Sequence, residues 1–462
     1  MNVVDEDGQP VAGAVIFAGD DELAATDASG EVEVAWSRRA TEFTVQAPGY
    51  TDRTIEIDEP PEEAVTVRIE TRRLRGIVRD GDGRPVPGVY VASGYGRAVT
   101  GPDGRFLVQL AEPGPVEVFR PAWEAADYTW DGSPGETTVI IEPRVIRAVH
   151  IAGDVPSDPQ RWDYQLRLAE NTELNGAMLD LKDEDGLIFY DSQVAIARDA
   201  GSVLADWNLS EVVGKFDEAG LYVIGRIVTF QDPRAARAFP ELAVFDANTG
   251  RPYEKAGQYF LDPSNGEART YALELAVEAC EAGVDEIQFD YIRFPDGFPD
   301  HVVFDAGTGT EMRASQDARI ATIESFMLSA REALHPLGCA VAADIFGFIT
   351  TAQDDGGIGQ KWSSVTDALD VVSPMVYPAL YGRDWYGYER PFDNPGPIVD
   401  NALADGLDRL DSGAVIRPWL QDWAYTDDQV RAQIESAEKY GLGWMLWNPF
   451  PNVSEGALDP AR

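Results

Sequence analysis

Acidic side chains occur near the ends of several apolar runs in the second half of the chain, where a buried core is expected. Asp180, Asp290 and Asp344 each lie in such a run, and Arg226 lies in another. A buried carboxylate is costly unless a partner compensates it, so acids at these positions are either paired or used in chemistry. Two carboxyl groups in different protonation states can act as proton donor and as nucleophile or base, which is what acid–base hydrolysis requires.

Eight apolar runs of the length of buried strands hold these residues, and segments with apolar residues at helical spacing separate them. The runs lie at 147–153, 174–182, 221–230, 285–294, 339–348, 370–378, 414–423 and 442–449. Eight strand–helix units in about 320 residues predict a (β/α)8 TIM barrel, in which chemistry takes place at the carboxyl ends of the strands. We expect this barrel to span residues 144–462.

The alternation of side chains along each run predicts which of them enter the barrel. Gln288 and Asp290 share one face of the fourth strand, and Asp344 shares a face with alanines on the fifth. The opposite faces are apolar and should pack on helices, so we expect the aspartates to point inward. We expect Asp180 and Lys182 to do the same on the second strand. The structural alternative is that these charged groups form salt bridges with one another and with Arg226.

Acids beside aromatic residues at one end of a barrel favour carbohydrate chemistry, because pyranose rings stack on aromatic faces and two acids flank the cleaved bond. Arg226 and Arg293 would keep Asp290 ionised, and apolar neighbours would raise the pKa of Asp344, as a proton donor requires. Trp447 would supply a stacking surface. The residues expected to bind the substrate are Asp180, Lys182, Asp183, Arg226, Gln288, Arg293, Tyr377, Gln421, Asp422, Trp447 and Asn448.

The segment GVDEIQFDYIRFP at 283–295 closely resembles the fourth strand of a barrel family catalogued as "putative glycosyl hydrolase". Further family-like segments follow in the right order, among them LDLKDEDG at 179–186, AADIFGF at 342–348 and GWMLWNP at 443–449. The resemblance covers nearly all of residues 144–450. It implies a TIM barrel that hydrolyses O-glycosidic bonds of a poly- or oligosaccharide.

Comparison with two other barrel families suggests how the acids divide their roles. Chitinase-like barrels carry a proton-donating glutamate where this chain has Ile292, which puts a chitinase mechanism in doubt. The pair Asp290 and Asp344 is similar in position to that of α-amylase-type barrels, which implies Asp290 as nucleophile and Asp344 as proton donor. Neighbouring strands lie about 4.8 Å apart, which favours a retaining mechanism. The alternatives are a non-catalytic carbohydrate-binding barrel, a polysaccharide lyase that uses a base such as Lys182 or Tyr377, and a non-glycosidic hydrolase on the same barrel.

The first 143 residues contain an internal repeat. VDEDGQPVAGAV at 4–15 and VRDGDGRPVPGV at 78–89 share their turn residues, and alternating stretches such as EVEVAW, FTVQA, RTIEI and GRFLVQL predict strands. The two copies resemble the carboxypeptidase regulatory-like (transthyretin-like) module. We expect two small β-sandwiches, at 1–70 and 71–143, which the resemblance implies to be accessory and without a catalytic group.

The composition describes the environment of the protein. The 462 residues include 80 acidic and 37 basic ones, for a net charge of −43, and only five of the basic residues are lysines. Such a surface is typical of salt-adapted proteins, because molar salt screens its repulsion. We therefore expect the fold to loosen in low salt. The charge also excludes a nucleic-acid partner, which would be repelled.

Cofactor, membrane and location signals are sparse. Three histidines without metal-binding spacing and two cysteines predict no metal site, and no organic cofactor is indicated. We expect Cys280 and Cys339 to be buried free thiols rather than a disulfide. No run is long enough to span a membrane. The opening MNVVDEDGQP lacks an export signal, so we expect a cytoplasmic location as written, and an extracellular one if further residues precede it.

Overall fold

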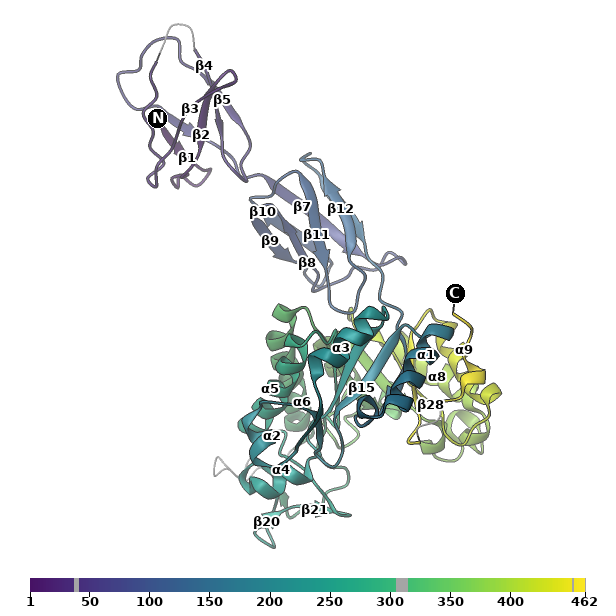
Figure 1. The fold of residues 1–462 in the computed structure, drawn as a ribbon. Coiled ribbons are helices and arrows are strands. Elements are labelled where there is room, and N and C mark those ends of the chain that lie inside the picture. Colours follow the sequence, from purple (N-terminus) through teal and green to yellow (C-terminus); the bar gives the residue numbers. More distant parts are fainter. Residues whose placement is uncertain (37–40, 305–314, 451–452, 462) are drawn as a thin grey trace. The chain divides into compact units, whose positions relative to one another are not determined.

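The computed structural model describes residues 1–36, 41–304, 315–450 and 453–461, and the chain divides into two compact units. Met1–Pro143 form the first unit and Arg144–Arg462 the second. Figure 1 shows the first unit built from strands and the second from strands surrounded by helices.

The first unit is all-β in its described part. Its strands are β1 (Asn2–Val4), β2 (Val15–Ala18), β3 (Asp21–Ala25), β4 (Glu42–Gln46), β5 (Arg53–Glu56), β6 (Thr66–Arg68), β7 (Arg73–Arg79), β8 (Tyr90–Ser93), β9 (Gly96–Val99), β10 (Arg105–Gln109), β11 (Gly114–Phe119), β12 (Ala126–Trp130) and β13 (Glu136–Ile140). They form the sheets β1-β6, β3-β2-β4-β5, β10-β7-β13 and β12-β11-β8-β9. Among the described residues of this unit, no sheet combines strands from before and after residue 70. The division into two modules at that point stays a prediction.

The two copies of the sequence repeat contain equivalent hydrogen bonds made by a threonine side chain. Thr26 Oγ1 accepts from the N–H of Ala14 at 2.8 Å and donates to the carbonyl of Val11 at 2.7 Å. In the second copy Thr100 makes the same pair of bonds, with Val89 N–H at 2.9 Å and Val86 O at 2.8 Å. A buried threonine therefore ties two turns together in each copy, which satisfies its hydroxyl group.

The strand expected at EVEVAW is wrong. Residues 31–36 alternate in burial, but only Glu31 makes a β-bridge, with Asn2. The other three quoted stretches correspond to β4, β5 and β10.

The second unit contains a closed barrel of eight parallel strands, as predicted. The strands are β14 (Arg147–Ile151), β15 (Gly176–Lys182), β18 (Tyr222–Val228), β23 (Glu286–Asp290), β25 (Ala340–Phe346), β26 (Val371–Val376), β28 (Trp419–Gln421) and β29 (Trp444–Trp447). They pair in this order, and β29 pairs with β14 to close the ring, while the short β27 (Val415–Ile416) extends the edge of β26. Each of the eight predicted runs holds one barrel strand.

Helices cover the outside of the barrel (Figure 1). They are α1 (Pro159–Asn171), α2 (Ala195–Asp199), α3 (Leu209–Glu218), α4 (Pro233–Ala238), α5 (Gly266–Glu281), α6 (Gln316–Leu334), α7 (Trp362–Ala368), α8 (Pro395–Asp408) and α9 (Asp427–Glu438). Short strands lie in the connections: β16 (Ile188–Tyr190), β17 (Val203–Trp207), β19 (Phe245–Asp246), β20 (Arg251–Pro252), β21 (Glu254–Lys255), β22 (Gln258–Tyr259) and β24 (Val302–Val303). Within the described ranges, no helix has both the length and the apolar character that crossing a membrane needs.

Strand register brings the predicted polar residues together. Asp180 pairs with Arg226 across β15 and β18, and Arg226 pairs with Gln288 across β18 and β23. The register of β15 shifts between Asp180 and Lys182. Such a bulge reverses the alternation of side chains beyond it.

The expectation of two free thiols is wrong, because Cys280 and Cys339 form a disulfide. Cys280 lies near the end of α5, which leads into β23, and Cys339 directly precedes β25. Since β23 and β25 are parallel neighbours, the segments that enter them lie side by side, and the two Cα atoms are 5.9 Å apart. The spacing of the two cysteines in the sequence does not by itself predict that these segments are neighbours.

Candidate active site

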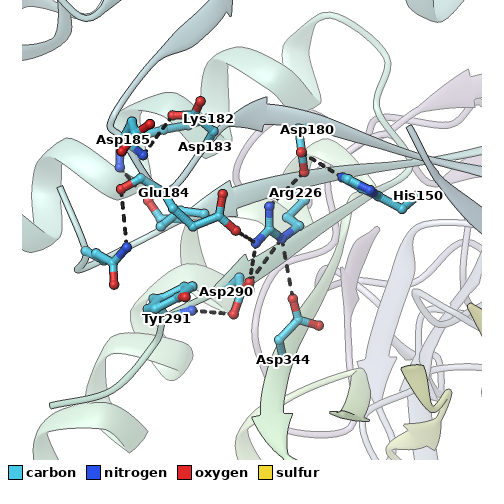
Figure 2. A network of polar contacts seen from close by, with 12 residues as sticks. His150, Asp180, Lys182, Asp183, Glu184, Asp185, Arg226, Asp290, Tyr291 and Asp344 are labelled. Atoms are coloured by element: carbon cyan, nitrogen blue, oxygen red, sulfur yellow. Dashed lines mark hydrogen bonds and ion pairs between the residues drawn. The ribbon is translucent and has the colours of Figure 1, made fainter. Parts of the chain in front are cut away.

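Arg226 is the centre of the polar network at the carboxyl end of the barrel (Figure 2). Its Nη1 donates to Asp180 Oδ1 at 2.8 Å, and its Nη2 donates to Glu184 Oε1 at 2.5 Å. Its Nε and Nη2 both donate to Asp290 Oδ2, at 3.0 and 2.5 Å. Asp344 Oδ2 lies 3.9 Å from Nε. Four carboxyl groups thus share one guanidinium that is only 2 % exposed.

Asp290, the last residue of β23, is held on both oxygens. Oδ2 accepts from Arg226, and Oδ1 accepts from the backbone N–H of Tyr291 at 2.6 Å. Tyr291 has a φ of 49°, in the left-handed region that non-glycine residues rarely adopt. The positive φ turns the chain away from the strand direction after Asp290, and β23 ends there.

Asp344 is the most deeply buried acid of the network, with a side chain that is 2 % exposed. Its Oδ1 accepts from Gln288 Nε2, and from the indole Nε1 of Trp419 at 2.5 Å. Burial and the negative charge of Asp290 raise the pKa of Asp344 well above its usual range, against the opposing effects of Arg226 and the two donors. Asp344 therefore keeps its proton where other acids lose theirs.

Asp180 has the opposite character, although it lies on the same guanidinium. Its Oδ2 is 2.8 Å from His150 Nε2, and the imidazole stacks on Trp447 with ring centroids 4.0 Å apart. Burial raises the pKa of Asp180, but the charges and hydrogen bonds of His150 and Arg226 outweigh it and lower that pKa to about 2. The partners of Asp180 and Asp344 therefore shift the pKa values of these two buried acids in opposite directions. Such a difference favours an ionised carboxyl group at one position and a protonated one at the other.

Glu184 is a member of the network that the sequence interpretation missed. Its side chain is 35 % exposed, far more than those of the three aspartates. It follows the β15 strand in an acidic turn, so strand alternation could not assign it. The acidic run 183–185 directly after a strand end is the signal that could have drawn attention to it.

Two predicted substrate-binding residues of the same segment lie apart from Arg226 (Figure 2). Lys182 was expected to point into the barrel, and this is wrong. Its ammonium is buried, contacts Asp232 Oδ2 at 3.0 Å and donates to the Val228 carbonyl at 2.5 Å. The bulge after Asp180 turns the side chain outward. Asp183 accepts the N–H groups of Asp185 and Leu187 and forms the turn, and burial raises its pKa to about 6.

Gln288 and Arg293 also serve neighbours within the protein. Gln288 is fully buried and donates to Asp344 rather than facing open space. Arg293, expected beside Asp290, instead donates to the Phe294 carbonyl and to Asp296 Oδ1, at 3.3 and 3.4 Å. Its guanidinium lies over the ring of Phe346. The left-handed turn at Tyr291 separates Arg293 from the direction of the strand.

The remaining predicted residues lie at the ends of β26, β28 and β29. Tyr377 packs edge-on against Trp423, with centroids 4.9 Å apart, and the charges of Asp344 and Asp290 contribute, after burial, to its raised pKa. Gln421 is fully buried and ties together two loops, through Ala379 N–H and the Trp423 carbonyl. It is therefore a structural residue of the barrel end.

Asp422 and Asn448 lie beside a partly enclosed cavity of about 100 Å³ that His150 and Leu446 also line. Asn448 donates to the Asp422 carbonyl at 2.9 Å, and Asp422 Oδ2 accepts from Ser454 N–H at 3.2 Å. Trp447 borders the network, because the Arg226 guanidinium lies over its ring at 5.0 Å. Among the described residues, no group of three or more His, Cys, Asp or Glu is arranged to hold a metal ion.

A second buried ion pair lies deeper in the barrel. Arg417 Nη1 donates to Glu286 Oε1 at 2.7 Å, and Tyr222 Oη donates to Glu286 Oε2 at 3.1 Å. Both charged side chains are fully buried. Glu286 shares its strand face with Gln288 and Asp290, so alternation alone could have identified it.

One family model matches most of the second unit. A family model described as "Putative glycosyl hydrolase domain" matches residues 148–452. No curated protein sequence matches the chain.

Among solved structures, a hypothetical protein from Ruminiclostridium thermocellum is 34% identical; the match covers 42% of this chain and 96% of that one, with a TM-score of 0.37. The PgaB (BpsB) glycoside hydrolase domain from Bordetella bronchiseptica is 17% identical over 66% of this chain and 94% of that one, with a TM-score of 0.49. The glycoside hydrolase domain of PelA from Pseudomonas aeruginosa is 12% identical over 68% and 96%, with a TM-score of 0.38. The family model covers well over half of the chain. The chain therefore belongs to the "Putative glycosyl hydrolase domain" family and is a glycoside hydrolase.

Proposed function

We propose that the site hydrolyses O-glycosidic bonds of a poly- or oligosaccharide with Asp290 as nucleophile and Asp344 as proton donor. The observation that carries this proposal is that both acids approach the same nitrogen, Arg226 Nε, in different environments. Asp290 accepts three hydrogen bonds from cationic or backbone donors, which suit a carboxylate. Asp344 is buried beside a like charge, which suits a carboxylic acid.

The geometry favours retention of anomeric configuration. The facing oxygens of Asp290 and Asp344 lie 3.0 and 3.9 Å from one nitrogen atom. Oxygens at these distances from one atom can reach only the lower limit of the carboxyl separation in inverting enzymes, about 6.5–9.5 Å. The separation in retaining enzymes, about 5–5.5 Å, lies well within their reach. In this mechanism Asp290 attacks the anomeric carbon while Asp344 protonates the leaving oxygen. Asp344 then accepts a proton from the water that releases the sugar from Asp290.

Hydrolysis is tested by incubating the protein with a panel of polysaccharides in molar salt and measuring released reducing ends. Asp290→Asn and Asp344→Asn should each lower turnover by orders of magnitude, because each removes one role of the pair. Their melting temperatures should stay near that of the unaltered protein. Asp199→Asn, an exposed position at the end of α2, is the matched control and should leave turnover unchanged.

Two outcomes would contradict the proposal. Normal turnover of either variant removes the assigned role of that residue. Binding of oligosaccharides by the unaltered protein, without cleavage of any panel member, favours a carbohydrate-binding barrel instead. The anomer that forms first, followed by NMR on a cleaved substrate, tests retention separately.

A further inference from the structure

The contacts of Asp344 distinguish its two oxygens. Oδ1 accepts the indole N–H of Trp419 at 2.5 Å and also the amide N–H of Gln288. An indole nitrogen can only donate, so Oδ1 is an acceptor whichever way the Gln288 amide is turned. A carboxyl oxygen that already accepts N–H groups is the carbonyl oxygen of the protonated acid, and the proton then lies on the other oxygen.

The other oxygen, Oδ2, faces Arg226, the residue that also holds Asp290. It is 3.9 Å from Arg226 Nε, which also binds Asp290 Oδ2. The charged and titratable groups that face Asp344 come from each strand around it: Asp290 on β23, Arg226 on β18 and Tyr377 after β26.

We infer that Trp419 and Gln288 are positioning residues that place the transferable proton of Asp344 on Oδ2, facing Asp290 and the substrate. This inference rests on the proposed function for the use of that proton, but the placement of the proton is a property of the protein without substrate. Trp419 is almost fully buried between β26 and β29, so its indole cannot turn away without leaving the barrel core. Because the indole N–H stays on Oδ1, the proton of Asp344 cannot occupy that side of the oxygen and remains on Oδ2.

Infrared spectroscopy tests the placement directly. In unaltered protein labelled with carbon-13 aspartate, a protonated carboxyl C=O band should persist at neutral pH and vanish in Asp344→Asn. In Trp419→Phe the band should move to higher frequency, because the carbonyl oxygen loses a hydrogen-bond donor. Gln288→Leu should shift it in the same direction. Ser373→Ala is the matched control. Ser373 is the register partner of Asp344 on β26, and its buried hydroxyl has no hydrogen-bond partner among the residues that the structure describes, so the band should not move.

The pH profile of kcat/KM on a cleaved substrate supplies the functional readout. Loss of a donor to the carboxyl group disfavours its ionised form, so the alkaline limb should move to higher pH by about one unit in Trp419→Phe. In the same variant kcat should fall at least tenfold with little change in KM, because substrate contacts remain. A variant that merely loosened the fold would not move the limb.

The inference is overturned if no C=O band is lost in Asp344→Asn, or if Trp419→Phe and Gln288→Leu both leave that band in place. Its failure is distinguishable from that of the proposed function. If the band behaves as expected but Asp344→Asn retains normal turnover, the proton is placed as inferred and is not used for catalysis. If Asp344→Asn is inactive but the band does not respond to Trp419→Phe, only the positioning role fails.

Discussion

Two buried arginines lie inside the same barrel and differ in the number of acids they serve. Deep in the barrel, the described part of the chain gives Arg417 one ion pair, with Glu286, and Tyr222 completes the hydrogen bonding of that glutamate. At the carboxyl end, Arg226 is shared by Asp180, Glu184, Asp290 and Asp344. The deep pair is balanced in charge, whereas the outer network has more acid than one cation can neutralise. We interpret the first as structural and the second as chemical.

The largest effect on stability should come from the deep pair. Arg417→Met leaves Glu286 buried without its cation, and breaking a buried pair in this way costs about 3–5 kcal/mol. The free energy of unfolding, measured with denaturant in molar salt, should fall by that amount, while kcat of the folded protein stays close to normal. Arg417→Met combined with Glu286→Gln should recover most of the loss, because no unpaired charge remains. A loss of turnover comparable to that of Asp290→Asn would remove the distinction between the two regions.

Asp180 should give the next largest effect and reveal which acid of the outer network stabilises the fold. Its pKa is lowered to about 2 by His150 and Arg226 against the opposing effect of burial. An acid with a depressed pKa in the folded state stabilises the protein above its unfolded pKa and loses that contribution as pH falls toward the folded value. The contribution is about 2–3 kcal/mol at neutral pH. Unfolding measured at several pH values should show this part lost between about pH 4 and pH 2.

The matched variant is Asp180→Asn, which should lower the free energy of unfolding at neutral pH and flatten its dependence on pH in that window. Asp344→Asn provides the contrast, since burial and Asp290 raise the pKa of Asp344 and its ionised form costs stability at neutral pH. The asparagine should therefore be as stable as the aspartate, or more so, in the same measurement. Equal losses in the two variants would contradict the assignment of opposite protonation states.

The sequence predicted the barrel better than it predicted the residues of the loops. The eight strands follow from apolar runs with a regular spacing, and alternation correctly turned Asp290 and Asp344 into the same space. Alternation failed at Lys182, because a bulge inside β15 leaves no sequence signal that the period has been broken. Glu184 was missed for the same physical reason, since the direction of a side chain in a turn depends on tertiary contacts.

Three further expectations do not depend on strand alternation: the state of the cysteines, the adaptation to salt, and the pairing of the buried charges. The disulfide required knowledge of which strands are neighbours, which the sequence contains only after the barrel order is known. Adaptation to salt and the identity of the two β-rich modules stay predictions. The accumulation of acid around Arg226 was also foreseen only as separate ion pairs, whereas four acids converge on one guanidinium.

The smallest effect concerns backbone strain, which also distinguishes the two regions. Tyr291, next to Asp290, has a φ of 49°, while neither Glu286 nor Arg417 has a positive φ. Holding a non-glycine residue in this conformation costs about 1 kcal/mol, which glycine does not pay. Tyr291→Gly and Tyr291→Ala both remove the ring, so their comparison isolates the backbone. The glycine variant should be the more stable by about 1 kcal/mol in denaturant unfolding, even though glycine gains more entropy in the unfolded chain. Equal stability of the two variants would mean that the turn that follows Asp290 is adopted without strain, and that the outer network differs from the deep pair in charge alone.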